Sequence, residues 1–334
     1  MNREQVLVAR RIFDDCVQRL ARHFDVEVNS SDEEWTQADL IRRLQGKAGV
    51  FVAGTERIDA TLLDACPDLR AVCSMAVGYN NIDVPACTAR GVVATNAPGV
   101  LTETTADFGF ALMMATARRI SESEHFLRSG QWMRWTVDLF AGADVHGATL
   151  GILGMGRIGQ GIARRGALGF GMKVLYHNRS RLSVDDERPL GARWVTRDDL
   201  MRQADHLVVV VPYGPDTHHL VGARELALMK PNATLTNIAR GGVVDDAALA
   251  EALQTLRIAA AGLDVFEGEP RPHPGLLAVP NVVLTPHIAS ASIPTRRAMA
   301  NLAVDNLIGL LTARRAVTPV NPQALESQRW RHTG

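Results

Sequence analysis

The stretch that decides the fold is ATLGILGMGRIGQGIARRGALGF, residues 148–170. It begins with apolar residues that favour a strand, passes through Gly154, Gly156 and Gly159 in the spacing G-x-G-x-x-G, and continues as a helical pattern. A glycine triplet recurs by chance, but a strand before it and a helix after it indicate a dinucleotide-binding turn. Gly154 permits the tight turn, Gly156 lets the backbone approach a pyrophosphate, and Gly159 lets the helix pack on the strand. The helix N-terminus would donate N–H groups to the phosphates.

Strand and helix patterns alternate on both sides of this stretch. Six strands are predicted from it onward, in residues 148–156, 172–178, 204–212, 233–240, 258–265 and 281–290. About four strands are predicted before it, in residues 5–10, 48–54, 69–77 and 91–98. Regular alternation implies parallel sheets joined by right-handed crossovers. The predicted fold class is therefore α/β, with two doubly wound parallel-sheet domains.

The two predicted domains do not follow one another simply along the chain. A helical pattern at 296–312 follows the last predicted strand and can cover the N-terminal sheet. We therefore predict a discontinuous, flavodoxin-like substrate-binding domain, 1–99 with 289–334. A Rossmann dinucleotide-binding domain, 100–288, is inserted into it and opens with a buried helix whose candidate N-cap is Thr102.

The segment at about 121–148 fits neither the strand nor the helix pattern. Trp132, Trp135, Leu139 and Phe140 lie in it among polar residues. Exposed aromatic residues in an irregular arm predict a subunit interface. An arm folded back on its own domain is the alternative.

The composition is that of a globular protein with two domains. The 334 residues are 46% hydrophobic and 22% charged, and 36 basic residues balance 36 acidic ones. A net charge of zero argues against nucleic acid or a membrane surface as the main partner. The N-terminus is charged where a secretory signal needs an apolar run, and no apolar stretch approaches the roughly 20 residues of a membrane span. We expect a cytoplasmic protein.

Cysteine usage supports the same location and predicts no metal site. Cys16, Cys66, Cys73 and Cys87 form no C-x-x-C pair, and no histidine cluster accompanies them. Buried free thiols in a reducing compartment are the expected state.

The choice of cofactor depends on LYHNRSR, residues 175–181. NAD-binding turns place an acid there, about 20 residues past the glycines, where it accepts hydrogen bonds from the ribose 2′-OH. Asn178 would not repel a 2′-phosphate, Arg179 and Arg181 can pair with it, and Ser180 can donate a hydrogen bond. We predict NADPH as the preferred cofactor, with NADH also able to serve. The alternative is that both arginines merely face solvent.

Three stretches end predicted strands of the second domain, at the edge where ligands gather in such folds. They are NIARGGVVD (237–245), GLDVFEGEP (262–270) and LTPHIAS (284–290). Hydride transfer to a ketone needs a proton donor, an oriented substrate and a polarised carbonyl. His287 suits the proton donor, because an imidazole can titrate near neutrality, and Arg240 can hold a substrate carboxylate in its planar fork. Either Glu267 or Glu269 could stabilise the imidazolium.

With these motifs, the chain resembles the D-2-hydroxyacid dehydrogenases and is similar to their glyoxylate/hydroxypyruvate and 2-ketogluconate reductase branch. The resemblance covers nearly the whole chain. It rests on AVGYNNIDV, NAPGVLTETTADFGFALMMATARR, GILGMGRIGQGIARR, NIARGGVVDDAALAEAL, AAGLDVFEGEP and NVVLTPHIAS.

The resemblance implies reduction of small 2-oxo acids, such as glyoxylate, hydroxypyruvate or 2-ketogluconate, to D-2-hydroxy acids. It assigns substrate binding to Arg240, acid–base chemistry to His287, and the role of its partner to Glu269 rather than Glu267. Val77 and Gly78 match a loop whose N–H groups receive the substrate carboxylate. The family is dimeric, and its two domains close about hinges that would lie near residues 98–99 and 289–290 here.

The remaining candidate residues are expected to contact the cofactor. Thr105, Ile238 and Asp264 match positions near the nicotinamide, and Ala289 stands where the family usually has glycine. The full set is Thr105, Gly154, Gly156, Arg157, Ile158, Gly159, Asn178, Arg179, Ser180, Arg181, Pro212, Ile238, Asp264 and Ala289.

The sequence differs from several related dehydrogenase families, and alternative functions remain. AGTERID, residues 53–59, lacks the arginine-rich loop of phosphoglycerate dehydrogenases, and Glu269 in place of glutamine argues against formate dehydrogenase. Leu139 and Phe140 stand where the reductase branch often has an aromatic residue that reaches a neighbouring active site. The alternatives are an NAD-linked catabolic dehydrogenase of D-2-hydroxy acids and a non-catalytic, nucleotide-sensing scaffold of the corepressor kind.

Overall fold

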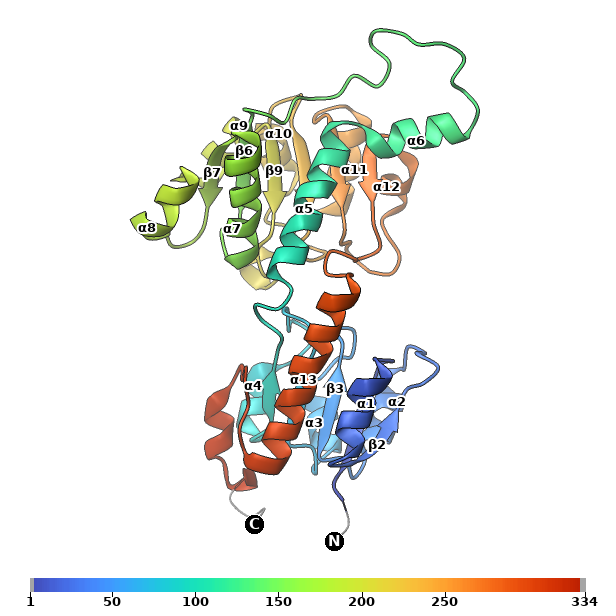
Figure 1. The fold of residues 1–334 in the computed structure, drawn as a ribbon, viewed down its shortest axis with the longest axis vertical. Helices are drawn as coiled ribbons and strands as arrows, with labels where there is room; N and C mark the ends of the chain where they lie inside the picture. Colours follow the sequence, from blue (N-terminus) through green and yellow to red (C-terminus); the bar gives the residue numbers. More distant parts are fainter. Residues whose placement is uncertain (1–2, 331–334) are drawn as a thin grey trace. The chain divides into compact units, whose positions relative to one another are not determined.

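The structure is a computed structural model that describes residues 3–330, and its chain divides into two compact units. Unit 1 combines Met1–Leu101 with Ser292–Gly334, and unit 2 is Thr102–Ala291. Residues 1–2 and 331–334, at the ends of the predicted first domain, lie outside the described residues. Both units are parallel α/β sheets covered by helices, so the predicted fold class is confirmed (Figure 1).

Unit 1 holds a five-stranded parallel sheet in the order β2-β1-β3-β4-β5. This is the flavodoxin-like order. Its strands are β1 Gln5–Val8, β2 Asp25–Val28, β3 Gly49–Val52, β4 Ala71–Ser74 and β5 Val93–Thr95. Its helices are α1 Asp14–Ala21, α2 Gln37–Leu44, α3 Ala60–Ala65, α4 Val84–Ala89 and α13 Ile293–Ala313.

The four strands predicted for unit 1 are present, but the count of four is wrong, because β2 is a fifth. Its sequence DVEV alternates charged with apolar residues, and it forms the edge of the sheet, where only one neighbour, β1, pairs with it. An edge strand needs fewer apolar residues than a central one, so it lacks the apolar run that marked the others.

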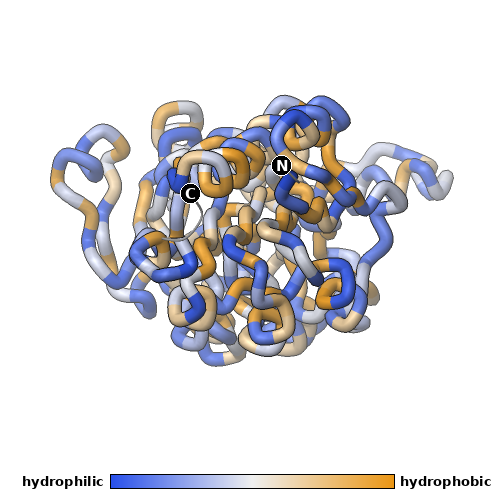
Figure 2. Tube along the Cα trace, turned by 90° about the horizontal axis from the view of Figure 1, so that it is seen from below, coloured by the Kyte–Doolittle hydropathy of each residue, from blue (hydrophilic) through white to orange (hydrophobic). Residues whose placement is uncertain are grey.

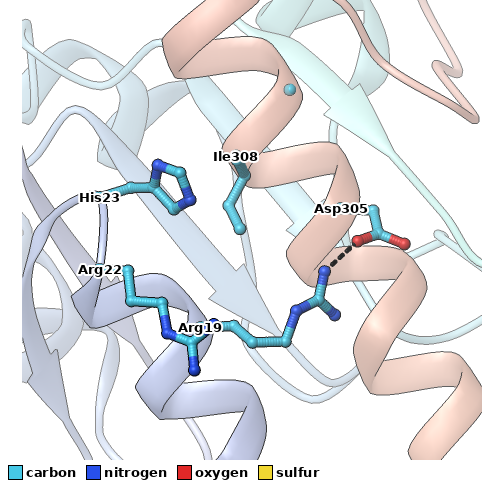
Figure 3. Close-up of a pocket in the computed structure, with 6 residues that line it drawn as sticks. Arg19, Arg22, His23, Asp305 and Ile308 are labelled. Carbon is cyan, nitrogen blue, oxygen red and sulfur yellow. Dashed lines mark hydrogen bonds and ion pairs between the residues drawn. The ribbon is translucent and has the colours of Figure 1, made fainter.

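Helix α13 covers the unit 1 sheet, as the sequence predicted. It packs against β3 and β4 and lies beside α1. Arg19 of α1 reaches across to Asn301 and Asp305 of α13, and the pair with Asp305 borders the small hollow in Figure 3.

Unit 2 holds a seven-stranded parallel sheet in the order β12-β11-β10-β9-β6-β7-β8. The strands are β6 Thr149–Leu153, β7 Lys173–His177, β8 Arg193–Trp194, β9 His206–Val209, β10 Thr234–Asn237, β11 Ala260–Leu263 and β12 Val282–Leu284. The helices are α5 Thr102–Ala117, α6 Ile120–Arg128, α7 Arg157–Arg164, α8 Val184–Glu187, α9 Arg197–Gln203, α10 Ala223–Leu228, α11 Asp246–Gln254 and α12 Pro274–Ala278.

The strand order of unit 2 reverses at β6, which lies between β7 and β9. Ligands of doubly wound sheets bind at such a switch point, outside the carboxyl ends of the strands. All six predicted strands are present, and the two-residue strand β8 was missed because it is too short to show a periodicity. Figure 2 shows that hydrophobic and hydrophilic stretches alternate along the chain.

The segment at 121–148 is partly helical, which corrects the prediction that it fits no regular pattern. Residues up to Arg128 form α6, and the arm beyond it is a long irregular loop that extends from the unit (Figure 1). Trp132 and Trp135 are 54% and 73% exposed, whereas the ring of Phe140 packs on Phe126 with centroids 5.1 Å apart. Thr102 is the first residue of α5 rather than its N-cap.

All four cysteines are free and buried, as predicted. Burial raises the pKa values of the Cys73 and Cys87 thiols to about 12. Within residues 3–330, no helix combines the length and the apolar character that crossing a membrane requires.

Candidate active site

The glycine-rich turn joins β6 to α7 at the switch point of unit 2. Gly154 has φ +106°, and a Cβ there would lie 2.8 Å from the carbonyl carbon of Val210. A Cβ on Gly159 would lie 2.3 Å from the Gly154 oxygen, so close helix packing requires that glycine too. Gly156 has no atom within 4 Å of its Cβ position. A side chain there would fill open space directly before the N-terminus of α7, so the turn fits a pyrophosphate.

Asn178, after β7, supports this turn. Its Oδ1 accepts a hydrogen bond from the Met155 N–H at 2.7 Å. The carboxyl end of β7 and the glycine-rich turn are therefore tied together, and the position that an acid occupies in NAD-specific turns is filled by a neutral amide.

The two arginines of LYHNRSR differ in their surroundings. Arg181 donates to both oxygens of Glu187, at 2.8 and 2.7 Å, and Tyr176 donates to the same carboxylate at 2.6 Å. These hydrogen bonds, from Arg181 first and Tyr176 second, lower the pKa of Glu187 to about 2 although its side chain is buried. Arg179 and Ser180 are exposed, and Arg179 makes no hydrogen bond or ion pair within residues 3–330.

Three charged side chains follow neighbouring strands of unit 2. Arg240 comes after β10, Glu269 after β11 and His287 after β12. His287 Nδ1 lies 2.9 Å from Glu269 Oε2, and the Phe266 N–H donates to Glu269 Oε1 at 2.9 Å. Burial alone would raise the pKa of Glu269, but the hydrogen bonds from His287 and from the Phe266 N–H outweigh it and lower this pKa. Glu269 therefore stays ionised beside the imidazole.

The structure also shows which of the two glutamates, Glu267 or Glu269, contacts His287. Glu267 Oε2 lies 2.9 Å from Nε2 of His219, a residue that the sequence analysis did not consider. Glu269, not Glu267, is the partner of His287.

Asp264 accepts hydrogen bonds from the loop that carries His287. His287 has a left-handed backbone, φ +54°, which is uncommon for a residue other than glycine. Asp264 is fully buried and accepts hydrogen bonds from Thr285 Oγ1 at 2.7 Å and from the N–H groups of Ile288 and Ala289 at 2.8 Å each. In this structure Asp264 therefore holds the loop, a role that the sequence analysis missed.

Arg240 is partly buried and keeps most of its donors available. Its Nη1 donates to the Ala239 carbonyl at 2.8 Å, and the other guanidinium N–H groups have no partner in the described chain. Burial lowers the pKa of Arg240, and the carboxylates of Glu269 and Asp264 act in the opposite direction. An arginine remains charged under such shifts, so a planar cationic fork lies near the histidine–glutamate pair.

Three other candidate cofactor residues also lie in unit 2. Ile238 follows β10, and Pro212 follows β9, where its carbonyl accepts from Thr217 Oγ1 at 2.8 Å. Thr105 of α5 is buried, and its hydroxyl has no partner among residues 3–330. Buried hydroxyls are nearly always hydrogen-bonded, so this orphaned group fits a site that receives a polar ligand.

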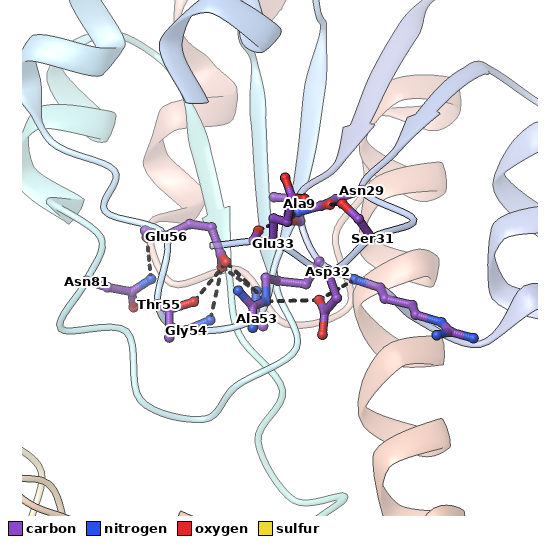
Figure 4. A network of polar contacts seen from close by, with 12 residues as sticks. Ala9, Asn29, Ser31, Asp32, Glu33, Ala53, Gly54, Thr55, Glu56 and Asn81 are labelled. Atoms are coloured by element: carbon purple, nitrogen blue, oxygen red, sulfur yellow. Dashed lines mark hydrogen bonds and ion pairs between the residues drawn. The ribbon is translucent and has the colours of Figure 1, made fainter. Parts of the chain in front are cut away.

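Val77 and Gly78 belong to unit 1, in the loop after β4. The Val77 carbonyl accepts from Asn96 Nδ2 at 2.7 Å. The neighbouring loop after β3 is held by Glu56, whose Oε2 accepts from the N–H groups of Ala53 at 2.8 Å and Gly54 at 3.3 Å (Figure 4). Asn81 Nδ2 donates to the Glu56 carbonyl at 2.7 Å and so joins the two loops.

Comparisons with known proteins agree with this geometry. Residues 110–289 match the family model described as D-isomer specific 2-hydroxyacid dehydrogenase, NAD binding domain. A glyoxylate reductase of Thermococcus onnurineus is 45% identical over 325 residues, which are 96% of this chain and 97% of the relative. An NADPH-dependent glyoxylate/hydroxypyruvate reductase of Sinorhizobium meliloti, solved with NADP and malonate, has a TM-score of 0.86 at 38% identity and covers 97% of this chain and 98% of its own. A glyoxylate reductase of Paecilomyes thermophila has a TM-score of 0.87 at 31% identity and covers 97% of this chain and 100% of its own.

Proposed function

The chain belongs to the D-isomer specific 2-hydroxyacid dehydrogenases, and from that premise we propose that it reduces glyoxylate and similar small 2-oxo acids, with NADPH preferred to NADH. The observation that carries the proposal is the His287–Glu269 pair with the cationic fork of Arg240 after the adjoining strand. Hydroxypyruvate and 2-ketogluconate are further substrates within the proposal.

The chain's own residues account for substrate orientation and proton transfer. When bound, the nicotinamide cofactor supplies a hydride. Arg240 holds the substrate carboxylate with the donors that the structure leaves free. The backbone N–H groups of Val77 and Gly78 are further candidates for binding a carboxylate. The charge that develops on the carbonyl oxygen is stabilised by the Arg240 guanidinium.

His287 supplies the proton. Because Glu269 holds Nδ1, the proton that moves is the one on Nε2, and it passes to the oxygen of the former carbonyl. The ionised carboxylate stabilises the imidazolium before transfer and fixes the ring during it. In the reverse direction, neutral His287 accepts the hydroxyl proton at Nε2.

Arg179 and Asn178 support the preference for NADPH. Asn178 brings no negative charge against a 2′-phosphate, and Arg179 is exposed with its guanidinium unengaged in the described chain. Arg181 supports it less strongly than the sequence predicted, because Glu187 already takes two of its donors. That ion pair favours the runner-up, an NADH-linked dehydrogenase of D-2-hydroxy acids.

Initial rates with NADPH and NADH test the proposal. We expect reduction of glyoxylate and hydroxypyruvate with both cofactors and a higher kcat/KM with NADPH. An equal or higher kcat/KM with NADH would leave the enzyme class intact and contradict the cofactor preference. Absence of turnover with any 2-oxo acid would contradict the proposed reaction.

Replacing Arg179 with glutamine should remove most of the preference. A hydrogen bond between charged partners contributes about 1.5–3 kcal/mol, so we expect the KM for NADPH to rise by roughly tenfold or more while the KM for NADH stays the same. The matched control is Arg188→Gln, an exposed arginine on the same connection, which should change neither value. A parallel rise in both KM values would show that Arg179 does not read the 2′-phosphate.

We also propose that the chain is a cytoplasmic homodimer in which unit 2 holds the cofactor and unit 1 is the substrate-binding domain. The exposed side chains of Trp132, Met133, Trp135 and Val137 on the arm support an interface. A groove of about 980 Å³ on unit 2, lined by α5 and by residues near α12 and β12, offers the surface that a second copy's arm would cover.

The double change Trp132→Ser, Trp135→Ser should shift the chain from dimer toward monomer in analytical ultracentrifugation. Both rings are large and exposed, and aromatic residues carry much of the binding free energy of interfaces. Leu168→Ser, at a leucine that is 69% exposed elsewhere on unit 2, is the control and should leave the dimer intact. If the double variant and the parent sediment identically as dimers, the arm is not the interface.

A further inference from the structure

A second group of chemistry-bearing side chains lies in unit 2, separate from the catalytic candidates. His218 and His219 follow β9 in a loop, and Glu267 follows β11. One ligand atom of each lies within 4.8 Å of the others, and Nε2 of His219 is 2.9 Å from Glu267 Oε2. The proposed reaction uses none of the three.

The two imidazoles are held in place. Their rings stack with centroids 3.9 Å apart, and His219 has a left-handed backbone, φ +49°, whose N–H donates to the Gly242 carbonyl at 2.7 Å. The left-handed backbone at His219 brings the side chains of His218 and His219 to the same side of the chain, whereas an extended backbone would point them in opposite directions. The hydrogen bond to Gly242 and the stacking of the two rings therefore hold the imidazoles together.

Each ring also has a polar neighbour at its second nitrogen. The Tyr213 hydroxyl lies 3.3 Å from Nδ1 of His218, and Asp245 Oδ2 lies 3.6 Å from Nδ1 of His219. Histidines that bind metals usually have a carboxylate or another polar group at the nitrogen that does not bind, which fixes the tautomer. These contacts leave Nε2 of each ring to the metal, and in this structure Nε2 of His219 already lies against Glu267 Oε2.

We propose that His218, His219 and Glu267 form a site for a divalent transition metal of the zinc type. Two imidazole nitrogens and one carboxylate oxygen are a ligand set that zinc accepts in proteins, with the fourth position open to water or a small ligand. Zinc bonded to nitrogen and oxygen at about 2.0–2.1 Å in a tetrahedron separates its ligand atoms by roughly 3.3 Å, so small side-chain rotations suffice. Magnesium and calcium prefer sets made of oxygen alone and should bind poorly.

Such a metal would join two loops that border the active site. Glu267 adjoins Phe266, whose N–H holds Glu269, and the His219 N–H is bonded to the loop that begins with Arg240 and Gly241. Binding would therefore fasten the segment that carries Glu269 to the loop after β9. The site is independent of the proposed reaction, so its failure would leave the reductase proposal unchanged.

Zinc titration of the metal-free full chain tests the site, with a metallochromic chelator as competitor and the apparent Tm as a second readout. We expect one equivalent of zinc to bind, the apparent Tm to rise with zinc concentration, and magnesium to have no effect. Glu267→Gln and His219→Asn should each weaken zinc binding by at least about tenfold and abolish the Tm shift. Asparagine tolerates the left-handed backbone, so the loop should survive the second change.

Two variants separate this site from other histidines. His125→Gln, at an exposed histidine on α6, should bind zinc like the parent. His287→Asn removes the other histidine–carboxylate pair and should also bind like the parent. Zinc binding that persists in Glu267→Gln and His219→Asn, or that is lost in His287→Asn, would overturn the proposal. Circular dichroism and NADPH affinity establish that each variant is folded.

Discussion

Replacing His287 with asparagine is expected to lower kcat for glyoxylate reduction by about 10²–10⁴-fold, because it removes the proton donor. Asparagine suits the left-handed backbone at this position, so the loop that Asp264 fixes should keep its shape. The affinity for NADPH, measured by fluorescence titration, should change little. A variant that retains more than about a tenth of the parent kcat would show that another group supplies the proton.

Glu269→Gln provides a control that leaves the imidazole in place. The lowered pKa of Glu269 keeps its carboxylate ionised down to acidic pH, so it can stabilise the imidazolium wherever the enzyme is assayed. Without that charge, the imidazole loses the carboxylate that orients its ring and stabilises the imidazolium during proton transfer, so kcat for glyoxylate reduction should fall while the affinity for NADPH stays the same. An unchanged kcat would mean that Glu269 only packs against the ring.

Most of the fold was predictable because its central strands are apolar runs and its turns are marked by glycine. The apolar run before Gly154 predicts a buried strand, because a parallel strand covered on both faces must be continuously hydrophobic. The prediction failed at β2 and β8, an edge strand with alternating charges and a strand of two residues. Four alternating residues and two residues are too few to stand out in a single sequence, and their pairing is decided by neighbours far along the chain.

The candidate site could be predicted as residue types at strand ends but not as contacts. Composition could not choose between Glu267 and Glu269, because the choice depends on which histidine each carboxylate faces across loops. The same holds for Arg181, since its partner Glu187 is a buried acid in a short helix that the sequence analysis did not consider. Spacing locates charged groups, whereas tertiary packing decides which of them are already paired.

Replacing Arg240 with glutamine is expected to lower kcat/KM for glyoxylate by roughly 30-fold to several thousand-fold. Removing one partner of a buried, charged hydrogen-bonded pair costs about 2–5 kcal/mol, and each 1.4 kcal/mol is a factor of ten. Glutamine keeps one donor but neither the charge nor the fork that fits a carboxylate. Steady-state kinetics with NADPH at saturation would measure the loss.

Two further measurements decide whether the loss at Arg240 reflects carboxylate binding. Arg240→Lys restores the charge without the fork, so its kcat/KM should lie between those of the parent and the glutamine variant. A 2-oxo amide, which has no carboxylate, should be a poor substrate on which Arg240→Gln loses less activity than on glyoxylate, because only the effect of Arg240 on the carbonyl oxygen remains. If Arg240→Gln slows the amide as much as glyoxylate, the guanidinium acts only on the carbonyl oxygen or through its neighbours Glu269 and Asp264, and it does not bind the substrate carboxylate.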